Sequence, residues 1–144
     1  PLPPGGAGFE VVGQFRGSVE EQDMAGWGAG KWHGDRQLWW TGARPGDTLD
    51  IRLNVAETGT YKVTAHLTKA VDYGIVRFFI DKLEAGGPID LYNDGVVPSG
   101  PVDLGTHRLE KGAHTLTVKI TGANDKAVKG YMFGLHRLVL DSVK

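Results

Sequence analysis

The chain has 144 residues, a formal net charge of −1 and no cysteine. Its length fits one domain, and 40% hydrophobic residues are enough to build a single core. The balanced charge gives no electrostatic footprint for nucleic acid, and no apolar run is long enough to span a membrane. The absence of cysteine excludes disulfides, thiolate zinc sites and cysteine nucleophiles. We therefore expect neither a nucleic-acid nor a membrane partner.

The first eight residues, PLPPGGAG, are rich in proline and glycine, which is typical of a linker between modules. They lack an initiator methionine and the charged and apolar regions of a signal peptide. We expect residues 1–8 to be linker-like and residues 9–144 to form one domain. We also expect the chain to be a piece cut from a longer protein.

Period-two alternation of hydrophobic residues predicts half-buried antiparallel strands. It is clearest in residues 49–55, 61–67 and 114–121. Other strands are expected at residues 9–15, 37–41, 74–81, 88–92, 102–109 and 131–140. Segment 18–23 (SVEEQD) is polar, and it could either start a helical turn or line a loop.

Turn-forming sequences separate these strands, and the chain contains 22 glycines and seven prolines. We interpret residues 81–87 as a turn and residues 93–101 as a loop, and no segment carries a convincing amphipathic helix. Many short strands with turns roughly every 8–12 residues indicate an all-β fold, a β-sandwich of the jelly-roll type.

Residues 26–42 (GWGAGKWHGDRQLWWTG) contain all four tryptophans of the chain. Sugar binding needs an exposed aromatic plane for the C–H face of the ring and planar polar groups for the hydroxyls. This stretch offers both kinds of group, flanked by glycines that allow close approach of the backbone. The candidate platform residues are Trp27, Trp32 and His33, and the candidate hydroxyl partners are Asp35, Arg36 and Gln37.

The same tryptophans could instead fill the core. Trp39 and Trp40 are neighbours in an expected strand, so their side chains point to opposite faces. One of the two should be in the core, while the other faces solvent, a loop or a partner. Trp27 and Trp32 lie in a glycine-rich loop, and either could be exposed or buried.

Three later loops place polar side chains where a site could form, because the loops of a sandwich cluster at its two ends. The candidate binding residues there are Asp72, Tyr73, Tyr92, Asn93 and Asn124. Turn capping is the alternative role for the same residue types.

The sequence shows no catalytic or metal-binding motif. The five histidines lack the spacing of a zinc site, and no two carboxylates are spaced as a glycosidase pair. A GxSxG elbow is absent, and the glycines of residues 26–30 are not followed by a helix that could bind phosphate. We therefore expect a domain without catalytic activity.

Two segments carry a resemblance to a known family: PGDTLDIRLNVAETGTYKVTAHL, and LEKGAHTLTVKITG followed by FGLHRLVLD. Over about residues 9–141 the chain resembles the galactose-binding-like jelly rolls that serve as carbohydrate-binding modules beside bacterial glycoside hydrolases. The resemblance implies a non-catalytic module of a larger exported bacterial protein, extracellular or periplasmic. Its partners would be a polysaccharide or oligosaccharide and the adjacent domains.

Modules of this kind often carry a structural calcium ion, held by an acidic residue in the first strand and another near the last. The resemblance assigns these positions to Glu10 and Asp141. Near the end of the domain, where such modules often have an acidic residue, this chain has His136.

A second hypothesis also fits the sequence. A structural or assembly domain would pack its aromatic surface against a neighbouring domain or a second copy of itself.

Overall fold

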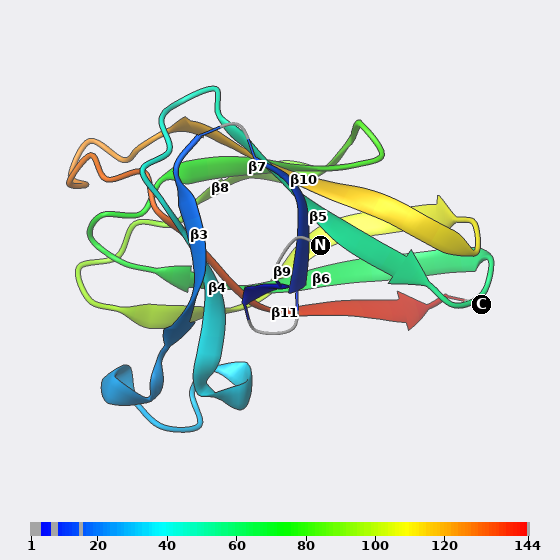
Figure 1. Cartoon of the computed structure of the whole chain (residues 1–144), viewed down its shortest axis with the longest axis horizontal. Helices are drawn as coiled ribbons and strands as arrows, with labels where there is room; N and C mark the ends of the chain where they lie inside the picture. Colours follow the sequence, from blue (N-terminus) through cyan, green and yellow to red (C-terminus); the bar gives the residue numbers. More distant parts are fainter. Residues whose placement is uncertain (1–3, 7–8, 15, 144) are drawn as a thin grey trace.

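The computed structural model describes residues 4–6, 9–14 and 16–143. They form a sandwich of two antiparallel sheets, which confirms the expected all-β fold (Figure 1). One sheet has the strand order β1–β2–β5–β10–β7–β8, and the other has the order β3–β4–β11–β6–β9. Several neighbouring pairs, such as β2 with β5 and β4 with β11, come from distant parts of the sequence, as in a jelly roll.

The six-stranded sheet consists of β1 (Pro4–Gly6), β2 (Phe9–Gln14), β5 (Thr48–Val55), β10 (Gly112–Gly122), β7 (Ile75–Ile80) and β8 (Leu83–Asp90). The five-stranded sheet consists of β3 (Ser18–Asp23), β4 (Arg36–Thr41), β11 (Phe133–Ser142), β6 (Gly59–Lys69) and β9 (Val97–Leu109). Two 3₁₀ turns, η1 (Ala25–Trp27) and η2 (His33–Asp35), lie between β3 and β4. Among the described residues, no helix is long and apolar enough to cross a membrane.

The core lies between the sheets and is built from the alternating aliphatic residues. In β5 the buried Leu49 and Ile51 alternate with the more exposed Asp50 and Arg52. Antiparallel pairing with β10 sets Leu116 opposite Ile51, so both inner faces carry apolar side chains. Full burial of one such side chain contributes about 1.5–3 kcal/mol to the free energy of unfolding. The alternation therefore determines which face of each strand points inward.

Three strands differ from the expectation, and each lies at the edge of a sheet. The ambiguous segment 18–23 is the edge strand β3. β8 begins at Leu83, inside the expected turn, and β9 begins at Val97, inside the expected loop. An edge strand pairs on one side only and leaves many side chains in solvent, so hydrophobic alternation does not reveal it.

The expected linker is partly structured. Pro4–Gly6 pairs with β2 as the short edge strand β1, so pairing begins before residue 9. Proline is tolerated in an edge strand, because one side of that strand's backbone has no partner strand. The remainder of the expected linker, residues 1–3 and 7–8, lies outside the described residues.

The two ends of the sandwich are built differently. One end, at the left of Figure 1, gathers the long loops β6–β7, β8–β9 and β10–β11, and we call it the loop end. Isolated parallel bridges join these loops, Ala70 to Tyr92 and Tyr73 to Met132. The loops are thus fixed to each other by backbone hydrogen bonds.

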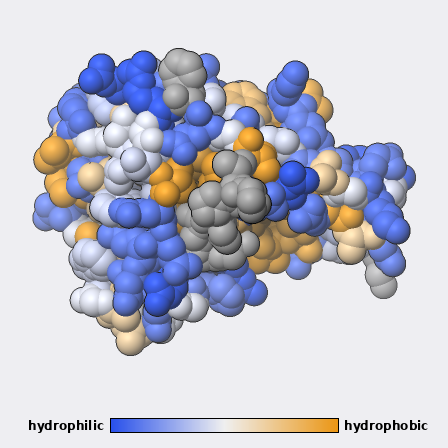
Figure 2. Space-filling view, viewed as in Figure 1, coloured by the Kyte–Doolittle hydropathy of each residue, from blue (hydrophilic) through white to orange (hydrophobic). Residues whose placement is uncertain are grey.

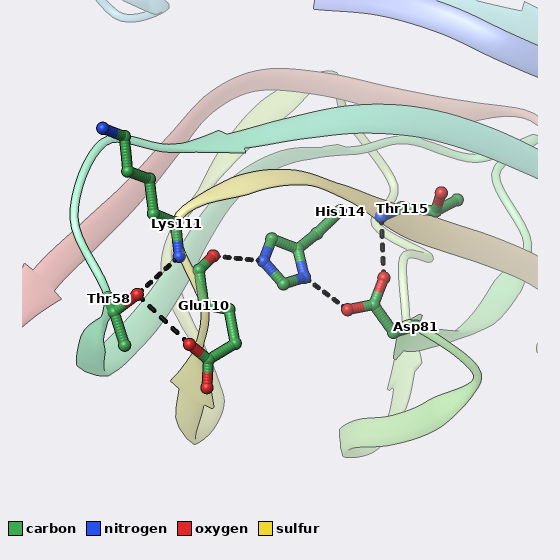
Figure 3. Close-up of polar contacts among 6 residues, drawn as sticks. All are labelled: Thr58, Asp81, Glu110, Lys111, His114 and Thr115. Carbon is green, nitrogen blue, oxygen red and sulfur yellow. Dashed lines mark hydrogen bonds and ion pairs between the residues drawn. The ribbon is translucent and has the colours of Figure 1, made fainter.

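The opposite end carries tight turns, and His114 of β10 fastens two of them together (Figure 3). Its Nδ1 is bonded to the carboxylate of Asp81 in the β7–β8 turn. Its Nε2 lies 2.6 Å from the carbonyl oxygen of Glu110 in the β9–β10 turn. Asp81 also accepts a hydrogen bond of 3.0 Å from the backbone N–H of Thr115. We call this end the turn end.

Candidate binding site at the loop end

A pocket of about 170 Å³ opens at the loop end. It takes residues from β3, β4, the β3–β4 connection, and the loops that precede β7, β9 and β11. The lining residues are Gln22, Met24, Trp27, Trp39, Ala70, Asp72, Tyr73, Val96 and Met132. We call it the loop-end pocket. Its wall therefore depends on segments that are far apart in the sequence.

Trp27 is the exposed aromatic side chain of this pocket, with 46% of its surface accessible. It ends η1, and its backbone N–H donates to the carbonyl of Met24 over 3.1 Å. Residues 24–35 form one loop, which we call the binding loop, and a 2.7 Å hydrogen bond from Met24 N–H to the Asp35 carbonyl closes its base. The closed loop holds the indole of Trp27 at the mouth of the pocket.

A chain of buried hydrogen bonds supports the pocket from behind. The Nε2 amide of Gln37 donates to the Tyr73 hydroxyl over 2.9 Å and to the Gln22 side-chain oxygen over 2.7 Å. The Oε1 atom of Gln37 accepts from the hydroxyl of Thr68. That hydroxyl oxygen in turn accepts 2.9 Å from the indole N–H of Trp32. The buried side chains of this network, those of Trp32, Gln37, Thr68 and Tyr73, are thus all hydrogen-bonded, as burial requires.

The pocket combines apolar surface with a few polar groups. Asp72 is the one formally charged residue among the described residues that line it. Tyr73 stays neutral, because burial raises the pKa of its phenol to about 12 despite the hydrogen bond from Gln37. Its hydroxyl therefore keeps its proton across the physiological range.

Three of the residues predicted for binding come together here: Trp27, Asp72 and Tyr73 all line the loop-end pocket. The prediction for the tryptophan pair is confirmed, since Trp40 is fully buried in the core and Trp39 is half-buried in the pocket wall.

Three predicted contact residues, Trp32, Gln37 and Tyr73, are buried, and this corrects the expectation. Trp32 is only 2% exposed and Gln37 is not exposed at all. Trp32 therefore cannot serve as an exposed platform. The side-chain amide of Gln37 is already hydrogen-bonded to Gln22, Tyr73 and Thr68. Tyr73, at 4% exposure, contributes to the wall rather than to an open surface. These residues hold the pocket wall in place and do not offer an exposed surface to a ligand.

Three other predicted residues, His33, Asp35 and Arg36, do not line the pocket and have local structural roles. Asp35 accepts a 2.7 Å hydrogen bond from the N–H of Gly30, and Arg36 forms an exposed ion pair of 2.9 Å with Glu21. The side chain of His33 is exposed, and its backbone N–H is bonded to a histidine of β11. These contacts shape the binding loop.

The later loops show the turn chemistry that was the alternative role. The side-chain amide of Asn93 donates 2.7 Å to the Gly95 carbonyl within its own loop. The side-chain amide of Asn124 donates 2.7 Å to the carboxylate of Asp90 and so ties the β10–β11 loop to the end of β8. Tyr92 is half-buried, and its N–H donates 2.9 Å to Asp90. None of these three residues lines the loop-end pocket.

Sequence reasoning missed several lining residues: Gln22, Met24, Ala70, Val96 and Met132. Gln22 belongs to β3, the strand that could not be assigned from its pattern. The others sit in separate loops, and only the pairing of those loops brings them together. The one usable signal was that sandwich loops cluster at the ends.

The residues assigned to calcium do not share a site, which corrects that expectation. Glu10 lies on β2 of the six-stranded sheet, where it forms a 3.3 Å ion pair with Arg52. Asp141 lies on β11 of the five-stranded sheet. Their chain neighbours Val11 and Leu140 pack on the core, so the two carboxylates point outward from different sheets. Within the described part of the chain, no group of three His, Asp or Glu side chains could hold a metal ion.

The sequence matches no protein-family model, and a comparison with curated proteins finds no match either. Comparison with solved structures does find similar folds. A xanthan lyase from Paenibacillus superposes with a TM-score of 0.80 at 19% identity, over 94% of this chain. The chain spans only 12% of that lyase.

Two isolated modules match along almost their whole length. A family 35 carbohydrate-binding module from Clostridium thermocellum has a TM-score of 0.53 at 14% identity, covering 90% of this chain and 92% of the module. A carbohydrate-binding module from Cellvibrio mixtus lichenase 5A, solved with cellotriose, has a TM-score of 0.55 at 14% identity. It covers 93% of this chain and 92% of the module. The chain therefore has the jelly-roll β-sandwich fold of these carbohydrate-binding modules.

Proposed function

We propose that the chain is a non-catalytic carbohydrate-binding module that holds a glycan at the loop-end pocket. The observation that carries this proposal is the exposed indole of Trp27 in one pocket with the Asp72 carboxylate and the Gln22 amide. The indole offers an apolar plane to the C–H face of a sugar ring. The polar groups provide acceptors and donors for its hydroxyls.

The charge of the pocket favours a neutral sugar. Asp72 is a carboxylate, and no lysine or arginine stands among the described lining residues. A uronic acid would place a second carboxylate near Asp72 without a cation to balance it, and like charges at close range repel. We therefore expect neutral hexose or pentose chains to bind better than acidic ones.

The module would belong to a larger exported bacterial protein, outside the cytoplasm. This extension is supported by the fold match to a small part of a xanthan lyase, in which a domain of this shape accompanies a much longer chain. The activity of the whole protein would then reside in the neighbouring domains, and this domain would hold the protein on its polysaccharide.

Replacement of the exposed tryptophan tests the proposal. We would measure affinity for cellotriose, mannotriose, isomaltotriose and a xanthan oligosaccharide by calorimetry, for wild type and Trp27→Ala. Loss of the aromatic plane should weaken binding at least tenfold, about 1.4 kcal/mol. Leu83→Ala is the matched control, because Leu83 is 71% exposed but stands outside the pocket.

If Trp27→Ala binds as tightly as wild type, the pocket is not the site. If wild type binds none of the sugars, nor any glycan on a broader array, the carbohydrate-binding proposal fails.

A contact with another domain is the second candidate. Val71 and Val128, 37% and 60% exposed, are joined by a 2.9 Å backbone hydrogen bond next to Asp72. Figure 2 shows a small apolar area at this end of the molecule, left in the view. Light scattering of the domain, with and without its natural neighbours in the chain, tests this candidate. A monomer without affinity for those neighbours contradicts it.

A further inference from the structure

A buried histidine fastens the binding loop to the five-stranded sheet. His136 of β11 is 5% exposed, and its Nδ1 accepts a hydrogen bond of 2.9 Å from the backbone N–H of His33. His33 begins η2, in the second half of the binding loop. This bond connects residues 103 positions apart in the chain. It therefore holds the loop against the sheet at a point away from the Met24–Asp35 bond at its base.

Only the neutral form of His136 fits this place. Nδ1 must keep its lone pair to accept from His33, so the ring proton resides on Nε2. That Nε2 is buried, and no described residue offers it a hydrogen-bond partner. A second proton would put an N–H at Nδ1, directly opposite the N–H of His33. The bond would then be replaced by two donors facing each other.

The groups around His136 oppose a positive charge as well. The ring of His66 on β6 meets it edge-on, with centroids 5.7 Å apart. Arg137 follows on β11, and the imidazole of His33 approaches from η2. Burial, and after it the charges of His66, His33 and Arg137, lower the pKa of His136 to about 4. The pKa of His66 is lowered too, by burial and by Arg137 and His33.

The same loop builds the pocket. Met24 and Trp27 line the loop-end pocket, and Trp32 anchors the loop through its bond to Thr68. Protonation of His136 would break its bond to His33 and put a positive charge beneath the binding loop. The loop would then no longer hold Trp27 in a fixed place.

We propose that His136 is a positioning residue for the loop-end pocket. Its neutral imidazole keeps the binding loop closed, and its protonation releases the loop and weakens glycan binding. This inference rests on the proposed function for the binding step, while the closure of the loop can be measured without a ligand.

The pH window follows from the two states of the loop. In the closed loop the pKa of His136 is about 4, and opening of the loop relieves part of its burial, so the pKa rises toward the ordinary 6.5. The open state therefore takes up the proton first as the pH falls. Between pH 6.5 and 4 the equilibrium moves toward the open loop by up to about 300-fold.

The test compares wild type with His136→Asn from pH 7 to pH 4. The asparagine oxygen can accept the His33 N–H but does not titrate. Affinity for the best-binding oligosaccharide of the panel should fall steeply with acid in wild type and much less in His136→Asn.

The exposed variant Arg137→Gln keeps the histidine but removes a charge that opposes its protonation. Its loss of affinity should therefore begin at a higher pH than in wild type.

Tryptophan fluorescence supplies the readout without a ligand. Opening exposes Trp32, so wild-type emission should shift to longer wavelength in acid while His136→Asn stays unchanged. Identical acid profiles of both variants, or an Arg137→Gln midpoint no higher than that of wild type, would overturn the inference. If no glycan binds at any pH, the proposed function fails, and the fluorescence profiles still decide whether His136 closes the loop.

Discussion

At the scale of single residues, Gly134 makes the support of the pocket possible. β11 lies between β4 and β6, and the side chain of Gln37 must cross it to reach Thr68. A Cβ at Gly134 would lie 2.0 Å from the Oε1 atom of Gln37. The absence of a side chain on the middle strand is therefore what lets the buried amide connect Thr68, Tyr73 and Gln22.

Gly134→Ala should break this arrangement. Gln37 would have to move, leaving buried polar groups without partners, and each such group costs about 1–3 kcal/mol. We expect the free energy of unfolding, measured in urea, to fall by about 2 kcal/mol or more. Gly87→Ala in β8 is the control, because a Cβ there meets nothing within 4 Å. An equal and small loss in both variants would show that the crossing is unimportant.

The sequence could not predict that Trp27 is exposed whereas Trp32 is buried. Both lie among glycines in one loop, and the pattern gave no reason to separate them. What separates them is the bond of Trp32 to Thr68, a residue 36 positions away. The nearby pair Trp39–Trp40 could be separated, because strand geometry alone sets neighbouring side chains on opposite faces.

At the scale of elements, His114 joins the β7–β8 and β9–β10 turns through the contacts of its two ring nitrogens (Figure 3). Both ring nitrogens face acceptors, so the protonated imidazole fits best. The bond to Asp81, and after it the bond to the Glu110 carbonyl, raise the pKa of His114. For Asp81, burial acts to raise the pKa, but the hydrogen bonds from His114 and Thr115 outweigh it and lower it.

This pairing predicts a loss of stability as the pH rises above 6.5. Because the folded pKa of His114 lies above 6.5, its contribution is complete below pH 6.5 and disappears as the pH rises through the folded value. Relative to His114→Gln, wild type should lose stability on that rise, by no more than about 1 kcal/mol for an exposed pair. Urea unfolding at several pH values measures this. A constant difference between the two proteins would contradict the role of the charge.

Strands were predictable to the extent that they bury one face. β5, β6 and β10 alternate clearly because they lie inside the sheets and pack on the core. β3 and β8 lie at edges and carry mainly exposed side chains, so their backbone pairing left no trace in the hydrophobic pattern.

At the scale of the whole molecule, the two ends respond to pH in opposite directions. At the loop end, His136 has a depressed pKa, so its neutral form stabilises the fold above pH 6.5 and stability falls as the pH drops toward about 4. The full effect corresponds to about 3 kcal/mol. At the turn end, His114 stabilises most in acid. The fold should thus loosen first at the loop end as the pH falls below 6.5, and at the turn end as the pH rises above 6.5.

The overall architecture followed from the sequence, whereas the pocket did not. Alternation, turns and family resemblance were enough for the jelly roll, which depends on many residues at once. The pocket depends on how a few loops pair, such as the bridge between Tyr73 and Met132. No local sequence pattern encodes that contact, so Met132 could not be predicted as a site residue.

The central claim is that a sugar contacts Trp27 in the loop-end pocket, and the indole N–H signals of the four tryptophans test it most directly. We would record them by NMR while adding the oligosaccharide that binds best. The signal of Trp27 should move most, followed by that of Trp39, while those of Trp32 and Trp40 stay in place because their N–H groups are bonded inside the protein. A saturable shift elsewhere with Trp27 unmoved would contradict the account.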